Sequence, residues 1–503
     1  MNLFGLLLDQ PRERVALASD DATWTYGGLA DASLRVAAGL GRLGLQPGDR
    51  VAYFLPNCVE LVLGYFGAFA AGVIGVPLNP RYQGAEVEHA VADSRPRALI
   101  ADAALLARLD GARLAALGIE AVFVRGGLAP PGTRPFAALT APAPRAAPAT
   151  VAPAADAVIL YTSGSTAAPK GVTHTHGGLH NAVRHQVATQ QLTATDVQLA
   201  WMGIAYIAAF CGQLLPSLAL GGRTVLLGRF APEAVLDAIA RQRVTRLQSG
   251  PTDLRDLLDA PGLAAADLTS LRACIAGGEQ IHRELHERFA ARTGFALTEA
   301  CGMTELYNYA SNPPFGAKRL GSIGHPTDGV DMRLVDRDGR EADEGEIHVR
   351  SDALMRGYWN NLEATAAVLR DGWLATGDLA RRDADGWYWF IGRRKHLIIR
   401  GASNIAPGEV EAVLVAHPAV ANAGVVGAPD RREGHVPVAF VQLRPGATVD
   451  AETLRAFAAE RLAAYKVPVR IAIVAALPLT ATGKVDRARL PISPSKPPFE
   501  SGG

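Results

Sequence analysis

Residues 157–171 read AVILYTSGSTAAPKG, and this stretch decides the expected fold. The apolar run Ala157–Tyr161 predicts a buried strand that ends where a polar loop begins. The loop gathers hydroxyl side chains, a glycine and a lysine: Thr162, Ser163, Gly164, Ser165, Thr166 and Lys170. Hydroxyls and unpaired backbone N–H groups at a strand end suit the phosphate tail of a nucleotide, and a polar surface turn is the alternative.

The loop differs from the standard phosphate loop of NTPases. Gly164 and Lys170 have the required spacing, but Pro169 stands where the second glycine belongs. Gly171 occupies the position at which a serine or threonine would bind magnesium. A hydrolytic NTPase is therefore disfavoured, whereas nucleotide binding is still expected.

Strand-like and helix-like segments alternate around this loop. A helix is expected from about Gly178, and further segments follow as strands (Arg223–Leu227, Val244–Gln248, Leu271–Ile275) and helices (Pro232–Arg241, His282–Arg292). Repeated βα units predict parallel or mixed sheets covered by helices, with ligands at the carboxyl ends of the strands.

The sequence pattern changes from about Val330, where short strand-like segments and turn residues predict a β-rich subdomain. A compact α+β segment follows Gly392, with a helix that opens at Pro407 and another over Ala451–Ala463. We therefore expect an α/β chain with a large N-terminal domain and a small C-terminal domain. The expected boundaries are 1–391, a linker at 392–396, 397–490, and a disordered tail at 491–503.

Composition excludes several classes of protein. The 503 residues are 49% hydrophobic and 20% charged, which argues against disorder, collagen and coiled coil. Lys+Arg number 50 and Asp+Glu 49, without a charged block, so a nucleic-acid partner is not expected. Four scattered cysteines support neither disulfides nor a zinc ribbon, and a cytoplasmic location is expected. Leu61–Leu78 and Val197–Gly222 are uncharged, but their glycines, prolines and glutamines favour buried core over transmembrane segments.

Four further motifs follow the polar loop in order. They are Cys301–Glu305 (CGMTE), Thr376–Asp378 (TGD), Gly392–Lys395 (GRRK) with Asn404–Glu411 (NIAPGEVE), and Pro478–Lys484 (PLTATGK). Together the five motifs resemble those of the adenylate-forming superfamily: acyl-CoA synthetases, aryl-CoA ligases, luciferases and peptide-synthetase adenylation domains. The chain has six lysines, and Lys170, Lys395 and Lys484 all lie in these motifs, where a compact positive charge is wanted.

The resemblance implies an ATP-dependent ligase that activates a carboxylic acid as acyl-adenylate and transfers the acyl group to coenzyme A. It implies catalytic roles for Lys484, Glu305, Thr304 and Lys170, with Glu305 holding Mg²⁺. It implies nucleotide contacts from Thr162, Ser163, Gly164, Ser165, Thr166, Gly277, Gly278, Glu279, Cys301, Asp378 and Arg393. Within that set, Gly277–Glu279 would flank adenine, while Asp378 and Arg393 would hold the ribose.

The resemblance further implies that the small domain is mobile and rotates about Lys395 after adenylation. Its other face would then present Gly401, Ala402, Ser403 and Asn404 to a CoA tunnel. The uncharged stretch Trp201–Gly222 would line the acyl pocket, with Trp201, Tyr206 and Phe210 as candidate walls. Fatty, alicyclic and aryl acids all fit such a pocket, and a homodimer is left open.

Several positions depart from the family pattern. Ala167 replaces a glycine of the loop, Cys301 replaces an aromatic residue near adenine, and Tyr206 falls where many members have histidine. His396 stands where an acidic residue commonly follows the hinge. Two alternatives therefore stay open: an adenylation domain that serves a carrier protein, and a nucleotide-binding homologue with impaired catalysis.

Two other patterns have structural explanations. Gly39–Gly44 matches a dinucleotide-binding motif but follows a helix-like stretch, so a helix end is expected. His174, His176, His180 and His185 suggest a metal site, yet without a carboxylate or cysteine beside them a polar helix start is favoured. Asp378, Glu305 and Arg393 could likewise serve as a turn cap, a surface ion-pair partner and a linker charge.

Overall fold

The computed structural model describes residues 2–19, 22–142, 147–162, 169–278, 281, 283–400, 403–430, 432–480 and 484–491. The chain divides into two compact units. Unit 1 comprises Met1–Ile281, Leu285–Met332 and Val349–Leu374, and unit 2 comprises His282–Glu284, Arg333–His348 and Ala375–Gly503. Beyond Pro491, the expected tail lies outside the described residues.

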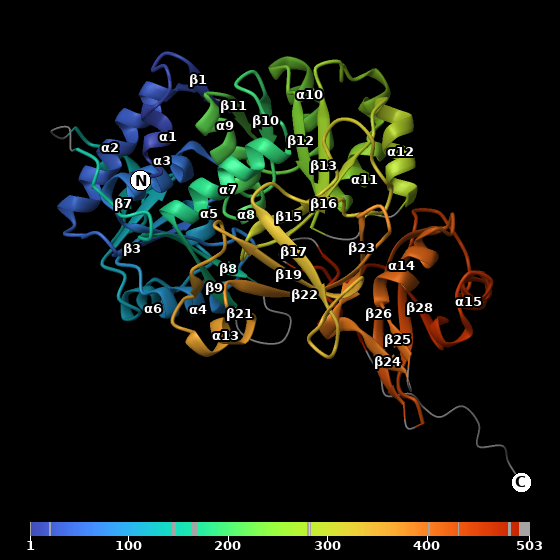
Figure 1. Ribbon diagram of the computed structural model, residues 1–503. Coiled ribbons are helices and arrows are strands. Elements are labelled where there is room, and N and C mark those ends of the chain that lie inside the picture. Colours follow the sequence, from blue (N-terminus) through green and yellow to red (C-terminus); the bar gives the residue numbers. More distant parts are fainter. Residues whose placement is uncertain are drawn as a thin grey trace, which may run out of the picture. The chain divides into compact units, whose positions relative to one another are not determined.

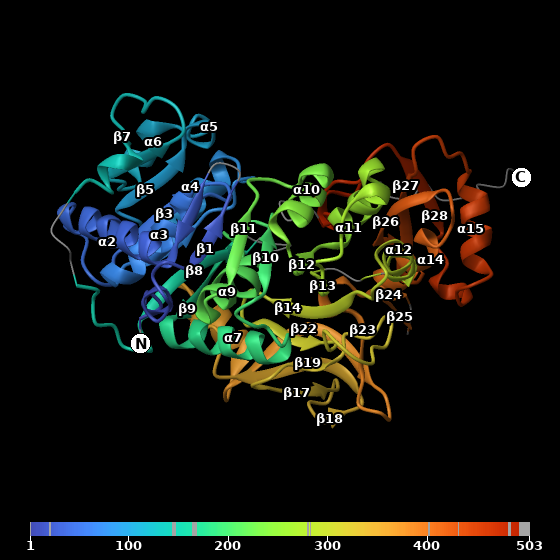
Figure 2. The same cartoon turned by 90° about the horizontal axis from the view of Figure 1, so that it is seen from above.

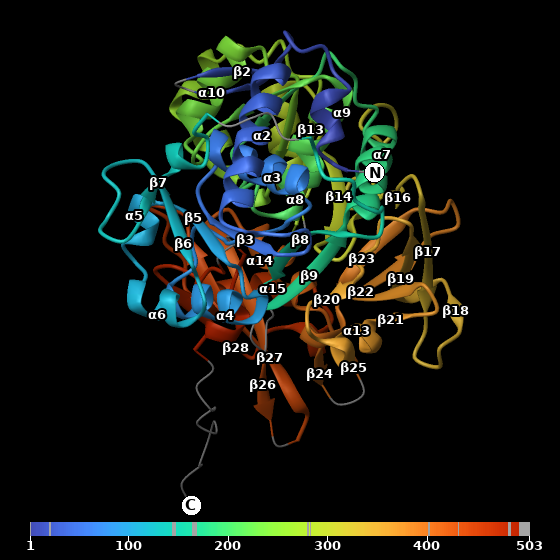
Figure 3. The ribbon, with the colours of Figure 1, turned by 90° about the vertical axis from the view of Figure 1, so that its left-hand side faces the viewer.

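The two strands that flank the polar loop belong to an eight-stranded sheet of unit 1, in the order β20-β9-β8-β4-β3-β5-β6-β7. Its strands are β3 (Arg50–Phe54), β4 (Ile74–Pro77), β5 (Ala98–Asp102), β6 (Ala121–Arg125), β7 (Arg134–Pro135), β8 (Asp156–Thr162), β9 (Lys170–Thr175) and β20 (Gly357–Tyr358). Helices α2 (Tyr26–Arg42) and α3 (Val59–Ala71) cover one face, and α4 (Gly84–Ser94) and α6 (Gly111–Ala116) cover the other (Figure 3). Strands β3, β4, β5 and β8 pair in parallel, as the sequence predicts.

The second sheet of unit 1 has nine strands, in the order β16-β15-β14-β13-β12-β10-β11-β1-β2. Its strands are β1 (Val15–Ala18), β2 (Thr23–Thr25), β10 (Val197–Ala200), β11 (Arg223–Leu226), β12 (Arg246–Ser249), β13 (Ala273–Gly277), β14 (Thr298–Met303), β15 (Tyr307–Ser311) and β16 (His325–Pro326). Helices α10 (Pro232–Gln242) and α11 (Pro251–Asp259) lie on one face, and α7 (His176–Thr189) and α9 (Leu215–Leu220) on the other (Figure 2). Strands β10 to β14 pair in parallel, which confirms the expected βα pattern. The other α-helices among the described residues of this unit are α1 (Gly5–Leu8), α5 (Ala103–Leu106), α8 (Ile207–Ala209), α13 (Leu362–Val368) and most of α12 (Arg283–Thr293), whose first two residues belong to unit 2.

Both uncharged stretches are buried elements of unit 1. Residues 61–78 contain most of α3 and all of β4, and residues 197–222 run from β10 through a π-helical turn at Phe210–Leu214 into α9. Glycines allow α3 to pack closely, because a Cβ at Gly67 would lie 2.5 Å from Val36 of α2. Within the described residues, helices with the length and apolarity needed to cross a membrane are absent.

A six-stranded sheet follows in the order β18-β17-β19-β22-β21, with β23 paired to β22. Its strands are β17 (Val330–Val335), β18 (Glu341–Ala342), β19 (Glu344–Ser351), β21 (Leu369–Arg370), β22 (Trp373–Arg382) and β23 (Tyr388–Arg393). Three of the boundaries between the two units fall within β17, β19 and β22. This sheet is the β-rich region that the short strands and turn signals predict.

The C-terminal part of unit 2 is an α+β body (Figure 1). It contains β24 (Ile398–Arg400), β25 (Ser403–Ile405), β26 (Val420–Asp430), β27 (Gly434–Leu443), β28 (Arg470–Val474), α14 (Pro407–Val415) and α15 (Ala451–Ala459). Alternate side chains of the sheet form two separate cores. Val425 and Val441 pack with α14 and α15, whereas Val426 and Phe440 pack with Leu477 and Leu490. The helices therefore cover one face of the sheet, and the segment that contains Lys484 covers the other.

His176, the first residue of α7, ties this helix to the N-terminal segment. Its side chain is fully buried, its Nδ1 accepts the N–H of Leu3 at 3.3 Å, and its ring lies edge-on to Phe69. Burial lowers the pKa of His176 to about 4. The imidazole is therefore neutral in the folded chain near neutral pH.

This burial predicts a pH dependence of stability. In the unfolded chain the pKa of a histidine is about 6.5, so between pH 6.5 and 4 the unfolded state binds a proton that the folded state does not. The stabilisation is complete above pH 6.5 and is lost as pH falls towards 4. His176 alone should lower the free energy of unfolding by about 2 kcal/mol between pH 7 and pH 5.

The variant His176→Asn keeps an acceptor for the Leu3 N–H but does not titrate in this range. Urea unfolding at pH 7 and pH 5 should show a smaller pH-dependent loss in the variant, by about 2 kcal/mol. His435→Asn, the same substitution at an exposed position, provides the control for the exchange of side chains itself. An unchanged pH dependence in His176→Asn would contradict the assignment.

Candidate active site

Strand β9 lies beside β8 and brings the two ends of the polar loop together. In the antiparallel β8–β9 ladder, Thr162 is the direct partner of Lys170. The Nε2–H of His89, from α4, donates to the carbonyl of Pro169 at 2.8 Å and fixes the end of the loop. Ser163, Gly164, Ser165 and Thr166 lie outside the described residues, so their predicted phosphate contacts stay predictions.

Thr304 and Glu305 lie in the turn between β14 and β15, and three hydrogen bonds hold them. The Nε2–H of His174, on β9, donates to the carbonyl of Thr304 at 2.7 Å. The backbone N–H of Met355 donates to the carbonyl of Glu305 at 2.8 Å, and the hydroxyl of Tyr358 donates to Glu305 Oε1 at 2.7 Å. Neighbours of β9 therefore position both residues.

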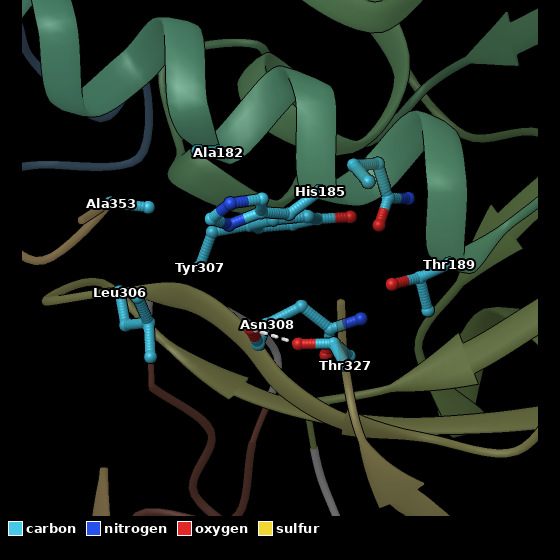
Figure 4. Close-up of a pocket in the computed structure, with 9 residues that line it drawn as sticks. Ala182, His185, Thr189, Leu306, Tyr307, Asn308, Thr327 and Ala353 are labelled. Carbon is cyan, nitrogen blue, oxygen red and sulfur yellow. Dashed lines mark hydrogen bonds between the residues drawn. The ribbon is translucent and has the colours of Figure 1, made fainter. Parts of the chain in front are cut away.

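The turn itself is tight. Tyr307 has φ +81°, a left-handed conformation that costs a non-glycine residue energy. A Cβ at Gly302 would lie 1.7 Å from the carbonyl oxygen of Tyr307, so this position requires glycine. A cavity of about 10 Å³ separates this turn from α7, with His185 on the helix side and Tyr307 and Asn308 on the strand side (Figure 4). Such a volume suffices for about one water molecule.

His174 acts as a neutral hydrogen-bond donor. Its side chain is buried, and burial lowers its pKa to about 4. Because its Nε2 faces a carbonyl, the proton of the neutral ring lies on Nε2. His174 and His176 thus bond to backbone groups of Thr304 and Leu3, and α7 begins at His176 as the polar helix start predicts.

Glu305, Tyr358 and Lys170 form one cluster, which we call the carboxylate–tyrosine–lysine cluster. Glu305 is 9% exposed, and Lys170 Nζ lies 4.9 Å from the centroid of the Tyr358 ring. Burial and the negative charge of Glu305 raise the pKa of Tyr358 well above its usual range, so its hydroxyl is a donor. Neither Tyr358 nor His174 was predicted as a site residue, since only tertiary packing joins them to Thr304 and Glu305.

The donor set at Glu305 fits a magnesium ion that arrives with a nucleotide. Among the described residues, hydrogen bonds reach Oε1 of Glu305 but not Oε2. Mg²⁺ in nucleotide sites is commonly held by one or two carboxylates together with substrate phosphates and water. A single buried carboxylate, whose partner Tyr358 also contacts a lysine, fits this arrangement.

The candidate adenine site lies at the ends of β13 and β14. Gly277 pairs with Ala300, and a Cβ at Gly277 would lie 2.4 Å from the Ala300 carbonyl oxygen. Gly278 follows with φ +88°. The next residue of β14, Cys301, has its Sγ 2.9 Å from the hydroxyl of Tyr309. Glu279 lies outside the described residues, and the adenine contacts stay predictions.

The three candidate walls of the acyl pocket differ in their surroundings. Phe210 is fully buried and stacks on Tyr65, with ring centroids 4.5 Å apart, which favours a structural role. Trp201 is also buried, and its Nε1–H donates to Asp253 Oδ2 at 2.9 Å. Tyr206 is half-buried. Their assignment to the acyl pocket stays a prediction.

In unit 2 the TGD and GRRK motifs meet on neighbouring strands. Asp378 is 1% exposed and pairs with Arg393 in the β22–β23 ladder, where Arg393 Nε donates to Asp378 Oδ1 at 2.8 Å. Glu346, which sequence reasoning missed, bonds to both motifs. Its Oε1 accepts the N–H of Gly377 at 2.9 Å, and its Oε2 binds Arg394 at 2.8 Å. The structure thus brings the predicted ribose residues together, and their ribose contacts stay a prediction.

Lys395 lies in a short 3-10 turn, Arg394–His396, and its side chain is exposed. Burial, followed by the neighbouring charges of Arg487, Lys395 and Arg393, lowers the pKa of His396 to about 4. Next along the chain, Ser403 and Asn404 belong to β25, while Gly401 and Ala402 lie outside the described residues. The hinge and tunnel roles of these residues stay predictions.

Two hydrogen bonds join Lys484 to Thr480. The hydroxyl of Thr480 accepts the N–H of Lys484 at 3.1 Å, and the N–H of Thr480 donates to the Lys484 carbonyl at 2.7 Å. Val485 then packs against Gly424 of β26, where a Cβ would lie 2.9 Å from Val485 Cγ1. The segment around Lys484 is therefore anchored on its sheet.

Comparison with known proteins identifies the family. The family described as AMP-binding enzyme matches residues 8–359, and the AMP-binding enzyme C-terminal domain matches residues 409–484. A feruloyl-CoA synthase from Amycolatopsis sp is 36% identical over 92% of both chains, and a long-chain-fatty-acid–CoA ligase from Bacillus subtilis is 33% identical over 95% of this chain and 91% of the relative. The crystal structure of an anthranilate CoA ligase in complex with anthranoyl-AMP superposes with a TM-score of 0.91 and 29% identity, covering 97% of this chain and 96% of that chain. The motifs, the fold and these matches agree, and the chain belongs to the AMP-binding enzyme family of adenylate-forming proteins.

Proposed function

We propose that this protein is an AMP-forming carboxylic acid–CoA ligase, with ATP and coenzyme A as co-substrates and Mg²⁺ as the cofactor. The main support is the carboxylate–tyrosine–lysine cluster in a chain whose relatives over 92% or more of its length are named as CoA ligases. These names include feruloyl-CoA synthase, indoleacetate–CoA ligase and long-chain-fatty-acid–CoA ligase. An acid with an apolar body, fatty, alicyclic or aryl, is the proposed substrate class.

The first half-reaction solves an electrostatic problem. A carboxylate is a poor electrophile, so it attacks the α-phosphorus of ATP and becomes an acyl-adenylate while pyrophosphate leaves. Both reactants are anions, and positive charge must therefore converge on the phosphates. Lys170, with the hydroxyls of Thr162 and the following loop, would bind the phosphate tail, and Lys484 would reach the α-phosphate. Mg²⁺ held at Glu305 would offset the charge of the phosphates.

Other residues would orient the nucleotide. Thr304 would contact a phosphate, and its position depends on the hydrogen bond from His174. The buried carboxylate of Asp378, held by Arg393, would accept hydrogen bonds from the ribose hydroxyls. Gly277 and Gly278 would leave room for the adenine ring beside Cys301.

The second half-reaction transfers the acyl group to the thiol of CoA, with AMP as the leaving group. We propose that residues 397–490 form a mobile domain, joined through a hinge at 392–396 to the domain of residues 1–391. Rotation about Lys395 would withdraw Lys484 and present the 401–404 segment to the thiol. A large change in the φ and ψ angles of one hinge residue is enough to produce such a rotation.

A panel of carboxylic acids tests the proposed activity. With ATP, Mg²⁺ and CoA, at least one apolar acid should produce AMP and an acyl-CoA, and ADP should not form. Chromatography of the nucleotides and thioesters measures both products. AMP formation that requires a carrier protein in place of CoA would indicate the alternative acceptor. Nucleotide binding with no turnover across the panel would indicate the impaired homologue, and acid-independent release of phosphate would contradict the adenylation chemistry.

Two lysine variants should separate the half-reactions. Lys484→Ala should lower adenylation, measured as acid-dependent exchange of pyrophosphate into ATP, by about 10²–10³-fold because one transition-state charge is lost. The same variant should still convert a supplied acyl-adenylate and CoA to the thioester. Lys395→Pro should retain pyrophosphate exchange but lose thioester formation, because proline restricts the hinge. Equal loss of both half-reactions in Lys484→Ala, or normal overall turnover in Lys395→Pro, would contradict these roles.

A further inference from the structure

Tyr358 contacts both charged residues that the proposed function places at the phosphates. Its hydroxyl donates to Glu305 Oε1 at 2.7 Å, and its ring lies 4.9 Å from Lys170 Nζ. Among the described residues, Lys170 and Glu305 form no ion pair with each other. The same tyrosine side chain therefore contacts an anionic residue through its hydroxyl and a cationic residue through its ring.

The backbone holds the Tyr358 side chain in this position. In the β9–β20 ladder Tyr358 pairs with Val172, and the N–H of Trp359 donates to the carbonyl of Gly171 at 2.7 Å. On its other side, the N–H of Tyr358 donates to Thr365 Oγ1 at 2.9 Å. The preceding Gly357 has φ +154°, and a Cβ there would lie 2.9 Å from Thr365 Cγ2, so the turn into Tyr358 requires glycine.

Each contact of Tyr358 has a separate chemical consequence. A hydroxyl that donates to one carboxylate oxygen fixes the rotation of the carboxylate and aims its other oxygen in one direction. The face of an aromatic ring attracts an ammonium without neutralising its charge. The hydroxyl thus acts on Glu305, and the ring acts on Lys170.

We propose that Tyr358 is a positioning residue with two separable roles. Its hydroxyl orients Glu305 so that Oε2 faces the Mg²⁺ of the Mg²⁺·ATP complex, and its ring holds Lys170 for the phosphate tail. This inference rests on the proposed function, because it takes Glu305 as the Mg²⁺ ligand and Lys170 as a phosphate ligand. Tyr358 acts through these two side chains and touches neither the acid nor the thiol.

The test compares binding of Mg²⁺·ATP with binding of metal-free ATP in EDTA, both without acid or CoA. Isothermal titration calorimetry gives the two dissociation constants, and their ratio reports the contribution of the metal. Tyr358→Phe removes the hydroxyl and keeps the ring, so Mg²⁺·ATP should bind about tenfold more weakly while metal-free ATP binds as in wild type. Tyr358→Leu also removes the ring, and binding of metal-free ATP should weaken as well.

A double-mutant cycle shows whether the effect passes through Glu305. Glu305→Gln should weaken binding of Mg²⁺·ATP, and adding Tyr358→Phe to it should cause no further loss. Tyr161→Phe is the matched control, because Tyr161 also donates to a carboxylate, Asp93, at 2.6 Å, and its removal should leave the ratio unchanged. The inference is wrong if Tyr358→Phe weakens both forms of ATP equally, if the ratio is unchanged, or if the effect persists in the Glu305→Gln background.

These measurements distinguish a failure of the positioning role of Tyr358 from a failure of the proposed ligase function. A wild-type protein that binds neither form of ATP would overturn both proposals. A wild-type protein that binds Mg²⁺·ATP but produces AMP with none of the acids would overturn the ligase activity, and the ratio in Tyr358→Phe would still decide the role of Tyr358. An active ligase with an unchanged ratio in Tyr358→Phe would overturn the positioning role alone.

Discussion

Strand β9 forms hydrogen bonds with β8 along one edge and with β20 along the other, and this pairing fixes where the candidate charges of unit 1 lie. Lys170 is the first residue of β9, and His174, four residues later, holds the carbonyl of Thr304. On the neighbouring strand, Tyr358 holds the carboxylate of Glu305. Residues nearly two hundred positions apart thus depend on one short strand, and a shift in its register would displace all of them.

Glu305 and Lys170 share a neutral partner, Tyr358, and within the described part of the chain their charges are not offset by a direct ion pair with one another. His174 is kept neutral by burial and supplies a hydrogen bond without adding positive charge beside Glu305. Tyr358 stays protonated and donates to Glu305, while its ring attracts Lys170. A negative group suited to a cation and a positive group suited to phosphate can therefore stand close together. In unit 2, by contrast, the guanidinium of Arg393 pairs directly with the carboxylate of Asp378, so these two charges offset one another.

Sequence reasoning predicted the parts of the structure that depend on local patterns. The βα alternation, the strand before the polar loop and the short strands and hairpins after Val330 follow from periodicity and turn residues, and the structure confirms them. Gly39–Gly44 is indeed a helix end, because α2 runs to Arg42 and Gly44 has φ +79°. Helix α15 ends at Ala459 and is shorter than the expected Ala451–Ala463, a boundary error that composition alone does not resolve.

The site was predictable only where a motif is contiguous in the sequence. Lys170, Glu305 and Asp378 lie in such motifs, whereas His174, Glu346 and Tyr358 act on them through contacts across strands. Burial of Phe210 against Tyr65 could not be foreseen either, because an apolar stretch looks the same in a core and in a pocket. The most direct test of the account is a crystal structure with Mg²⁺ and a non-hydrolysable ATP analogue. The account predicts the cation on Oε2 of Glu305, the Tyr358 hydroxyl on Oε1 and Lys170 at the phosphate tail, and a nucleotide whose cation and phosphates contact neither Glu305 nor Lys170 would contradict it.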